Sequence, residues 1–198
     1  MPKYPAVTLK AGREKSIRRR HPWIFSGAIA GVEGRPEPGA TVRVITPSGD
    51  FLAWAAYSPS SQIRLRAWSF DETSDIDAAF IQRRIARSVD LRRELGLLGA
   101  GSACRLVFGE SDGLPGLIVD RYDEHLVCQF LSAGAEYWRD AVIAALDNLL
   151  SPHSIVERSE ASVRLKEGLE SRRGLLRGAT PPAPVEFFAG GIRQLIDL

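Results

Sequence analysis

The sequence contains few cysteines and has no long apolar run. Its two cysteines, Cys104 and Cys128, form no CxxC pair and have no metal-ligand spacing. Both stand in apolar segments, so we expect two reduced, buried thiols without a catalytic role. No apolar run approaches the roughly 20 residues of a membrane helix, and the N-terminus lacks the apolar core of a signal peptide. These absences predict a cytoplasmic protein without a membrane partner.

The charges are unevenly distributed along the 198 residues. The net charge is only +2, but residues 1–70 carry +7 and residues 71–198 carry −5. A concentration of basic side chains is typical of a phosphate-binding surface, and the alternative is a solvated basic face. Seven basic residues fall within the first twenty positions: Lys3, Lys10, Arg13, Lys15, Arg18, Arg19 and Arg20.

Aromatic residues follow this basic run directly. His21 and Trp23 stand next to three arginines, and an aromatic ring beside cations can stack on a base while the arginines hold phosphates. The alternative is that the segment 23–25 is a buried strand or turn. For Ile24 and Phe25 we favour the buried position, and for Trp23 both interpretations stay open.

Short runs rich in β-formers fill residues 40–68. Residues 40–46, 51–58 and 62–68 are each bounded by turn residues, which predicts three strands of a small closed barrel over residues 1–70. In the last run apolar residues alternate with Arg64 and Arg66, so we expect one buried face and one basic face. Arg64 and Arg66 therefore join the predicted RNA-binding residues.

The period changes to that of a helix after Phe70. Ser74 and Asp77 resemble a capping box, Ile81, Ile85 and Val89 form an apolar stripe, and Gly96 is a plausible stop. Several arginines decorate this helix, and for most of them we expect pairing with nearby carboxylates: Arg83, Arg84, Arg87, Arg92 and Arg93.

The rest of the central segment mixes strands and helices. Residues 104–132 predict a meander of three strands, residues 135–150 a second amphipathic helix, and residues 154–160 a strand that leads into a short helix ended by Gly168. The fold class is therefore α+β, with a barrel over residues 1–70 and a mixed α/β domain over 71–178. Residues 179–198 read as a proline-rich linker and a hairpin that turns at Gly190-Gly191.

The two carboxylates Glu110 and Asp112 lie beside glycine turns. They are possible cleft residues that orient a base or bind a cation, but a turn in which Asp112 caps its own backbone is the favoured interpretation. Arg158, Arg164 and Lys166 are weaker candidates for the same cleft. No metal site is predicted.

Several ordered segments together resemble one family. The runs RHPWIFSGAI, RLVFGESDGLPGLIVDRY, LSAGAEYWRD and ERSEASVRLKEGL, followed by the proline linker, are similar to the ribosomal RNA large-subunit methyltransferase I family. The resemblance implies an N-terminal PUA domain, a central α/β domain and a C-terminal Rossmann-like domain that binds S-adenosylmethionine (SAM). It implies methylation of carbon 5 of a cytosine in 23S rRNA, and it suggests a homodimer.

The chain matches the first two of these domains. We therefore expect the Rossmann-like domain to be absent and the chain to continue in nature beyond Leu198, because a terminal hairpin needs further partners. No segment offers the glycine-rich turn between a buried strand and a helix that SAM binding requires. We expect no catalytic residue and no cofactor in these residues, with SAM bound by the full-length protein.

Three functional hypotheses follow. The favoured one is the RNA-recognition portion of an rRNA cytosine-5 methyltransferase, inactive by itself, which contacts RNA through the residues already described: Lys10, Arg13, Lys15, Arg18, Arg19, Arg20, His21, Trp23, Arg64 and Arg66. The first alternative is a freestanding RNA-binding or ribosome-assembly module, which a natural product ending at Leu198 would favour. The second is a central domain that binds a small molecule or protein, which failure to bind structured RNA would favour.

Overall fold

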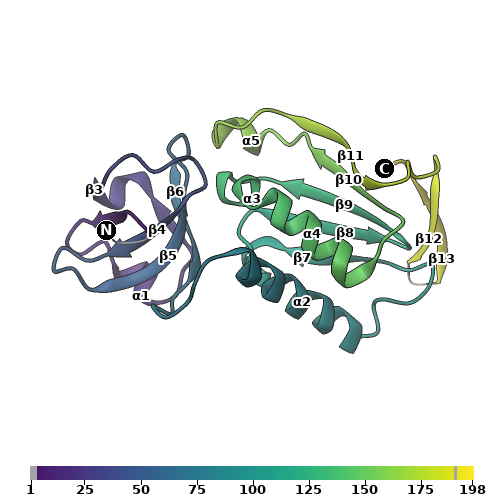
Figure 1. The fold of residues 1–198 in the computed structure, drawn as a ribbon, viewed down its shortest axis with the longest axis horizontal. Coiled ribbons are helices and arrows are strands. Elements are labelled where there is room, and N and C mark those ends of the chain that lie inside the picture. The colour runs from purple at the N-terminus through teal and green to yellow at the C-terminus, as the bar shows by residue number, and fades with distance from the viewer. Residues whose placement is uncertain (1–3, 190) are drawn as a thin grey trace.

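The structure is a computed structural model that describes residues 4–189 and 191–198. It contains a curled β-sheet near the N-terminus and a second, flatter sheet with helices in front of it, as Figure 1 shows from purple to green. The mixed α and β character expected from the sequence is confirmed. None of the helices in the described residues has the length and the apolar character needed to span a bilayer.

The first sheet has six strands in the order β2-β6-β5-β4-β1-β3. It curls around a core that includes Val7, Leu9, Val44 and Leu65, and Ile17 of the short helix α1 (Lys15–Arg18) enters the same core. In the described residues the end strands β2 and β3 do not pair, so this sheet, which we call the barrel, is open rather than closed as expected. The three strands predicted from the sequence are β4, β5 and β6. The strands are β1 (Ala6–Leu9), β2 (Trp23–Phe25), β3 (Ile29–Val32), β4 (Thr41–Ile45), β5 (Phe51–Tyr57) and β6 (Ile63–Ser69), and a 3-10 turn, η1 (Ser26–Ala28), lies between β2 and β3.

The second sheet has five strands in the order β11-β10-β9-β8-β7. The predicted meander is confirmed, because β8 pairs antiparallel with both β7 and β9, whereas β10 pairs parallel with β9. The elements are α2 (Ala78–Glu94), β7 (Ala103–Phe108), η2 (Gly109–Asp112), β8 (Leu117–Tyr122), β9 (His125–Phe130), α3 (Ala133–Tyr137), α4 (Arg139–Leu150), β10 (Ser154–Ser159), α5 (Val163–Lys166) and β11 (Arg172–Gly178).

The long helix α2 forms where the apolar stripe predicts it, and Ile81, Ile85 and Val89 are buried. The expected capping box is wrong: Asp77 is itself the N-cap and accepts a hydrogen bond from the Phe80 N–H at 2.7 Å, whereas Ser74 Oγ lies 2.9 Å from Ser69 Oγ. An aspartate can satisfy the first free N–H groups directly, so the helix begins one turn later than a cap at Ser74 would place it.

The second predicted helix is interrupted. It consists of α3 and α4, which meet at Trp138, a residue with φ −94° and ψ 13°. Val142, Ala145 and Leu146 of α4 are buried as expected, and α4 packs beside α2 in front of the sheet (Figure 1). Both predicted thiols are free: Cys128 is buried in the central strand β9 and Cys104 is half-buried in the edge strand β7.

The chain ends in a hairpin of β12 (Val185–Ala189) and β13 (Ile192–Ile196), paired antiparallel, which confirms the predicted hairpin. Gly190, half of its predicted turn, lies outside the described residues. The hairpin packs on the second sheet through Phe187, whose ring meets that of Tyr122 edge to face at 5.2 Å between centroids.

The barrel has a core of its own and also contributes side chains to the core of the second domain. On β5, Ala53 and Ala55 face the barrel interior, whereas Trp54 and Ala56 belong to the core of the second domain. Trp68 of β6 also belongs to the core of the second domain. The prediction that the outer face of residues 62–68 is solvated and basic is therefore wrong beyond Leu65, since from there the second domain covers that face.

Candidate nucleic-acid interface

The basic run of the first segment lies exposed on one end of the barrel, apart from Lys3, which lies outside the described residues. Residues of this run flank α1, whose Ile17 anchors it to the barrel core, so the charged side chains of the turn point outward. The exposed residues are Lys10, Arg13, Lys15, Arg18, Arg19, Arg20 and His21. In the part of the chain that the structure describes, none of these seven pairs with a carboxylate. Of the six Lys and Arg side chains in this set, Lys10 donates from Nζ to the Gly27 carbonyl oxygen at 3.0 Å. Exposed cations without a carboxylate partner can meet phosphates.

Phe25 corrects one expectation from the sequence. Ile24 is buried as expected, but 53% of Phe25 is exposed. The reason is the alternation of side chains along β2: Ile24 points into the barrel, so its neighbour Phe25 points out of it. Phe25 borders a hollow of about 400 Å³ together with Arg13, Lys15 and Trp23. An exposed ring beside two cations has the chemistry of a base-stacking position.

Trp23 and Arg66 lie at the seam between the barrel and the second domain. Trp23 Nε1 donates to Glu110 Oε1 at 2.6 Å, and Arg66 Nη1 lies 3.1 Å from the same oxygen. Arg66 Nη2 donates to Glu167 Oε1 at 3.0 Å. Because Arg66 is almost fully buried between two carboxylates, it joins the two domains and is not exposed for the RNA contact expected from the sequence.

Arg64 is only partly exposed, and its guanidinium donates to the carbonyl oxygen of Pro59 within the β5–β6 connection. Arg164, a weaker candidate for the cleft, is fully buried and pairs with Glu136 at 2.9 Å. Arg158 donates to the Asp197 carbonyl at 3.1 Å, whereas Lys166 is exposed.

The two carboxylates Glu110 and Asp112 have structural partners. Arg92 binds Asp112 through two hydrogen bonds of 2.7 and 2.8 Å, and Asp112 Oδ2 accepts from the Phe108 N–H at 2.6 Å. The favoured interpretation of Asp112, a cap on its own turn, agrees with this geometry. Glu110 instead reaches across the seam to Trp23 and Arg66.

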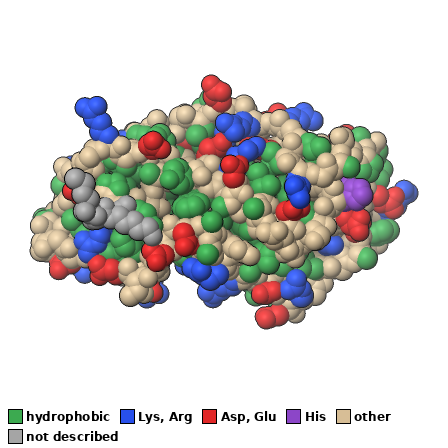
Figure 2. Space-filling model, viewed as in Figure 1, with side chains coloured by type: hydrophobic (Ala, Val, Ile, Leu, Met, Phe, Trp, Pro, Cys, Tyr) green, Lys and Arg blue, Asp and Glu red, His purple; other side chains and the backbone are tan. Residues whose placement is uncertain are grey.

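Basic side chains of the second domain are interspersed with acidic ones on the face drawn in Figure 2. Of the five arginines on α2, Arg92 pairs with Asp112 and Arg93 with Asp90. In the described residues Arg83, Arg84 and Arg87 make no such pair, and the partner of Arg92 lies 20 residues away, so the expected local pairing holds for Arg93 alone. Sequence spacing missed this because the partners of Arg84 are a ring and a carbonyl rather than a carboxylate.

The connection between the parallel strands β9 and β10 of the second sheet has no space for SAM. The turn between β9 and α3 would be the place for a nucleotide, since the helix that follows opens its N–H groups there. Glu167 Oε2 already accepts from the Ala133 N–H at 3.2 Å, and the barrel covers Gly134 so closely that a Cβ there would lie 2.4 Å from Ala56 Cβ. These residues do not fit the cofactor.

The barrel belongs to a recognised class of domain. The family model of a PUA-like domain matches residues 7–70, which cover β1 through β6. The fold of nearly the whole chain is also found in a solved structure, a candidate SAM-dependent methyltransferase from Streptococcus mutans. The TM-score is 0.77 at 16% identity, over 96% of this chain and 47% of that one.

By sequence, the chain belongs to the ribosomal RNA large subunit methyltransferase I family. It is 47% identical over 195 residues to the family member of Klebsiella pneumoniae subsp. pneumoniae, and 45% identical over 197 residues to that of Salmonella arizonae. These alignments cover 98% and 100% of this chain but 49% of each relative. The chain therefore spans about half the length of the curated relatives it matches.

Proposed function

We propose that this chain is the RNA-recognition portion of a SAM-dependent rRNA cytosine-5 methyltransferase. The observation that carries the proposal is the exposed basic surface around α1, in which seven side chains lack carboxylate partners among the described residues. This surface belongs to the PUA-like domain, and the relatives are named as rRNA methyltransferases. The substrate is 23S rRNA in this proposal.

The contribution of the chain is binding and orientation. The phosphates are held by six exposed side chains, Lys10, Arg13, Lys15, Arg18, Arg19 and Arg20, while His21 and the partly exposed edge of Trp23 contact bases. Methyl transfer uses SAM as the donor, and we assign the donor site and the reacting nucleophile to the half of the relatives' length that this chain does not span. The packed crossover at Gly134 supports that assignment.

The test is a titration of the 198-residue chain with a 23S rRNA fragment at two or more salt concentrations, together with a titration with SAM. With six phosphate contacts, the logarithm of the affinity should fall with the logarithm of the salt concentration at a slope of roughly −4 to −5. A slope near zero would overturn the phosphate-led mode of binding. Micromolar SAM binding would overturn the assignment of the donor site.

A further inference from the structure

A second basic surface lies where the barrel meets α2. A hollow of about 530 Å³ opens there, and it is bordered by Arg20 after α1, by the end of β6, and by Arg84 and Arg87 of α2. A larger hollow of about 790 Å³ lies along α2 and shares Arg84, Arg87, Glu110 and Gly113 with it. The two form one continuous groove across the seam, which we call the seam groove.

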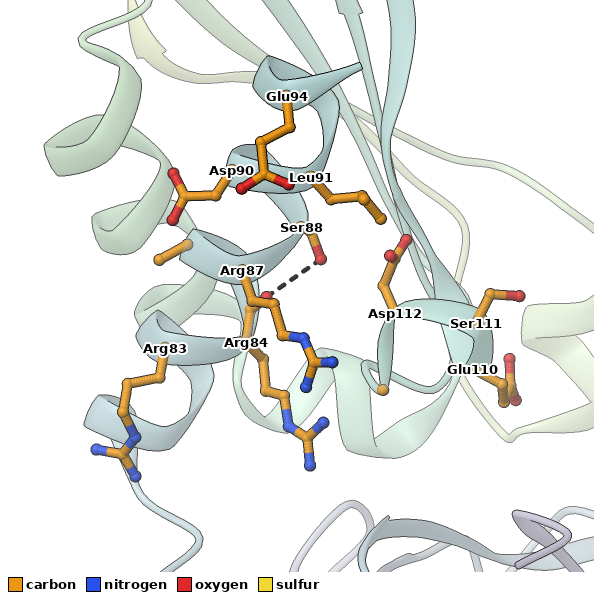
Figure 3. Close-up of a pocket in the computed structure, with 12 residues that line it drawn as sticks. Arg83, Arg84, Arg87, Ser88, Asp90, Leu91, Glu94, Glu110, Ser111 and Asp112 are labelled. Atoms are coloured by element: carbon orange, nitrogen blue, oxygen red, sulfur yellow. Dashed lines mark hydrogen bonds between the residues drawn. The ribbon is translucent and has the colours of Figure 1, made fainter.

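Arg84 and Arg87 point into this groove together. In Figure 3 their side chains leave α2 on the same side and extend into the space between the helix and the segment that carries Glu110 and Asp112. Arg83 lies one position earlier on the same helix and borders the groove at its edge. The helix thus presents neighbouring guanidinium groups to one space.

Three of the five carboxylates that border the groove already have basic partners. Glu110 binds Trp23 and Arg66, Asp112 binds Arg92, and Asp90 binds Arg93. Two others remain along the groove: Asp71, whose carboxylate accepts two hydrogen bonds from Thr73, and Glu94, the last residue of α2, two turns beyond Arg87. Within residues 4–189 and 191–198, no carboxylate lies within 4.0 Å of Arg84 or Arg87.

Arg84 is a partly buried cation without an anion. Its guanidinium lies 4.9 Å from the centroid of the Phe80 ring and 3.4 Å from the Trp68 carbonyl oxygen, and it also packs against Gly113. Burial, and then the charge of Arg87, lower the pKa of Arg84 below its ordinary value. Withdrawing a cation from water without pairing it costs free energy, which a bound anion would offset.

Arg20 borders the groove from the barrel, and its backbone is strained. Its φ is +61°, in the left-handed region that a glycine would occupy without strain and that costs other residues about 1 kcal/mol or more. Its N–H caps α1 by donating to the Ile17 carbonyl oxygen at 2.9 Å, which holds the backbone in place. An arginine at this position places a third cation at the groove.

We infer that the seam groove binds a phosphodiester group of the RNA, held by Arg84 and Arg87 from α2 and by Arg20 from the barrel. The inference rests on the proposed function, because it continues the RNA path from the surface around α1 across the seam. The ligand is an anion of low volume with several acceptor oxygens, which two adjacent guanidinium groups bind with charge-assisted hydrogen bonds. The RNA thereby contacts both domains.

The test measures the salt dependence of 23S rRNA fragment binding for the intact chain and for Arg84→Gln/Arg87→Gln. The double variant should bind more weakly, and its slope should be shallower by about 0.7 to 0.9 for each phosphate that it no longer neutralises. Arg173→Gln is the control, because it removes the same charge from an exposed side chain of β11 that borders neither hollow. Arg87→Lys should keep most of the slope, since the cation remains.

Two further measurements separate the possible failures. Arg87→Gln alone alters an exposed side chain, so its slope reports the phosphate contact even if the double variant unfolds. If the intact chain binds with the expected slope and both groove variants match Arg173→Gln, the seam groove is not a phosphate site and the inference is overturned. If the intact chain shows no salt-dependent binding, the proposed function itself fails.

Discussion

At the residue scale, Arg66 joins the two domains through charges that are removed from water. Its side chain is 8% exposed and that of Glu167 is 1% exposed. Replacing Arg66 by Met would leave Glu110 and Glu167 without their shared cation, so we expect the free energy of unfolding to fall by about 3 kcal/mol or more. Urea unfolding measures this loss.

Arg43→Met is the control, because it breaks a more exposed pair with Glu72 that should contribute less than about 1 kcal/mol. Equal losses of unfolding free energy in the two variants would show that burial does not increase the contribution of Arg66 to stability.

Glu167 makes the same interaction sensitive to acid. Burial disfavours its charge, but a hydrogen bond from Ser61 and the Arg66 guanidinium outweigh burial and hold the pKa of Glu167 below its ordinary value. A lowered pKa adds stability that is fully present above the unfolded-state value of about 4.3 and is lost as the pH falls through the folded-state value. The difference in urea midpoint between the natural chain and Glu167→Gln should therefore shrink below about pH 4, and a difference independent of pH would contradict this account.

At the scale of elements, the approach of α3 to β5 depends on one glycine. A Cβ on Gly134 would lie 2.4 Å from Ala56 Cβ and 3.0 Å from Trp68 Cζ2. Alanine normally favours a helix, so a loss of stability in Gly134→Ala would report the seam rather than the helix. We expect a loss of about 1 to 3 kcal/mol in urea unfolding, because the two elements must separate.

Gly99→Ala is the matched substitution, since a Cβ at Gly99 would have nothing within 4 Å and no positive φ is involved. A Gly134→Ala variant as stable as Gly99→Ala would mean that α3 and β5 can move apart without lowering the free energy of unfolding.

The elements also show what periodicity can and cannot predict. The stripe of Ile81, Ile85 and Val89 identifies α2 because its burial repeats with the turn of the helix. The break at Trp138 has no such signal: the apolar period continues through it, and neither glycine nor proline marks it. The N-cap expected at Ser74 belongs instead to Asp77, because both residues are good caps and only the tertiary contacts of Ser74 decide between them.

At the scale of the molecule, the contribution of the barrel to the core of the second domain predicts joint unfolding. Trp54 and Trp68 come from the barrel but are buried with α2 and the second sheet. The barrel cannot unfold without exposing that core, so tryptophan fluorescence and far-UV circular dichroism should give coincident urea transitions. Two separated transitions would show that the barrel and the second domain are independent units.

The same two-sided burial explains why part of the candidate site has no signal in the sequence. Alternation correctly separates Leu65 from its basic neighbours, but it cannot tell a solvated arginine from one paired with a distant carboxylate. The partners of Arg66 lie 44 and 101 residues away in the sequence. The basic run before Trp23 is visible because its charges are contiguous, whereas the seam groove combines Arg20 with residues of α2 that only the fold brings near.

Because Cys128 lies in the central strand β9, the rate at which its thiol reacts reports how often the sheet opens. Its thiol is fully buried, and burial raises its pKa well above the ordinary value, so a thiol reagent must wait until β9 becomes exposed. Cys104, half-buried on the edge strand β7, should react first. We expect labelling in two phases, a fast one for Cys104 and a slow one for Cys128. The rate of the slow phase should fall further when bound RNA contacts both the barrel and α2. A single fast phase for both thiols would mean that the centre of the sheet opens as readily as its edge.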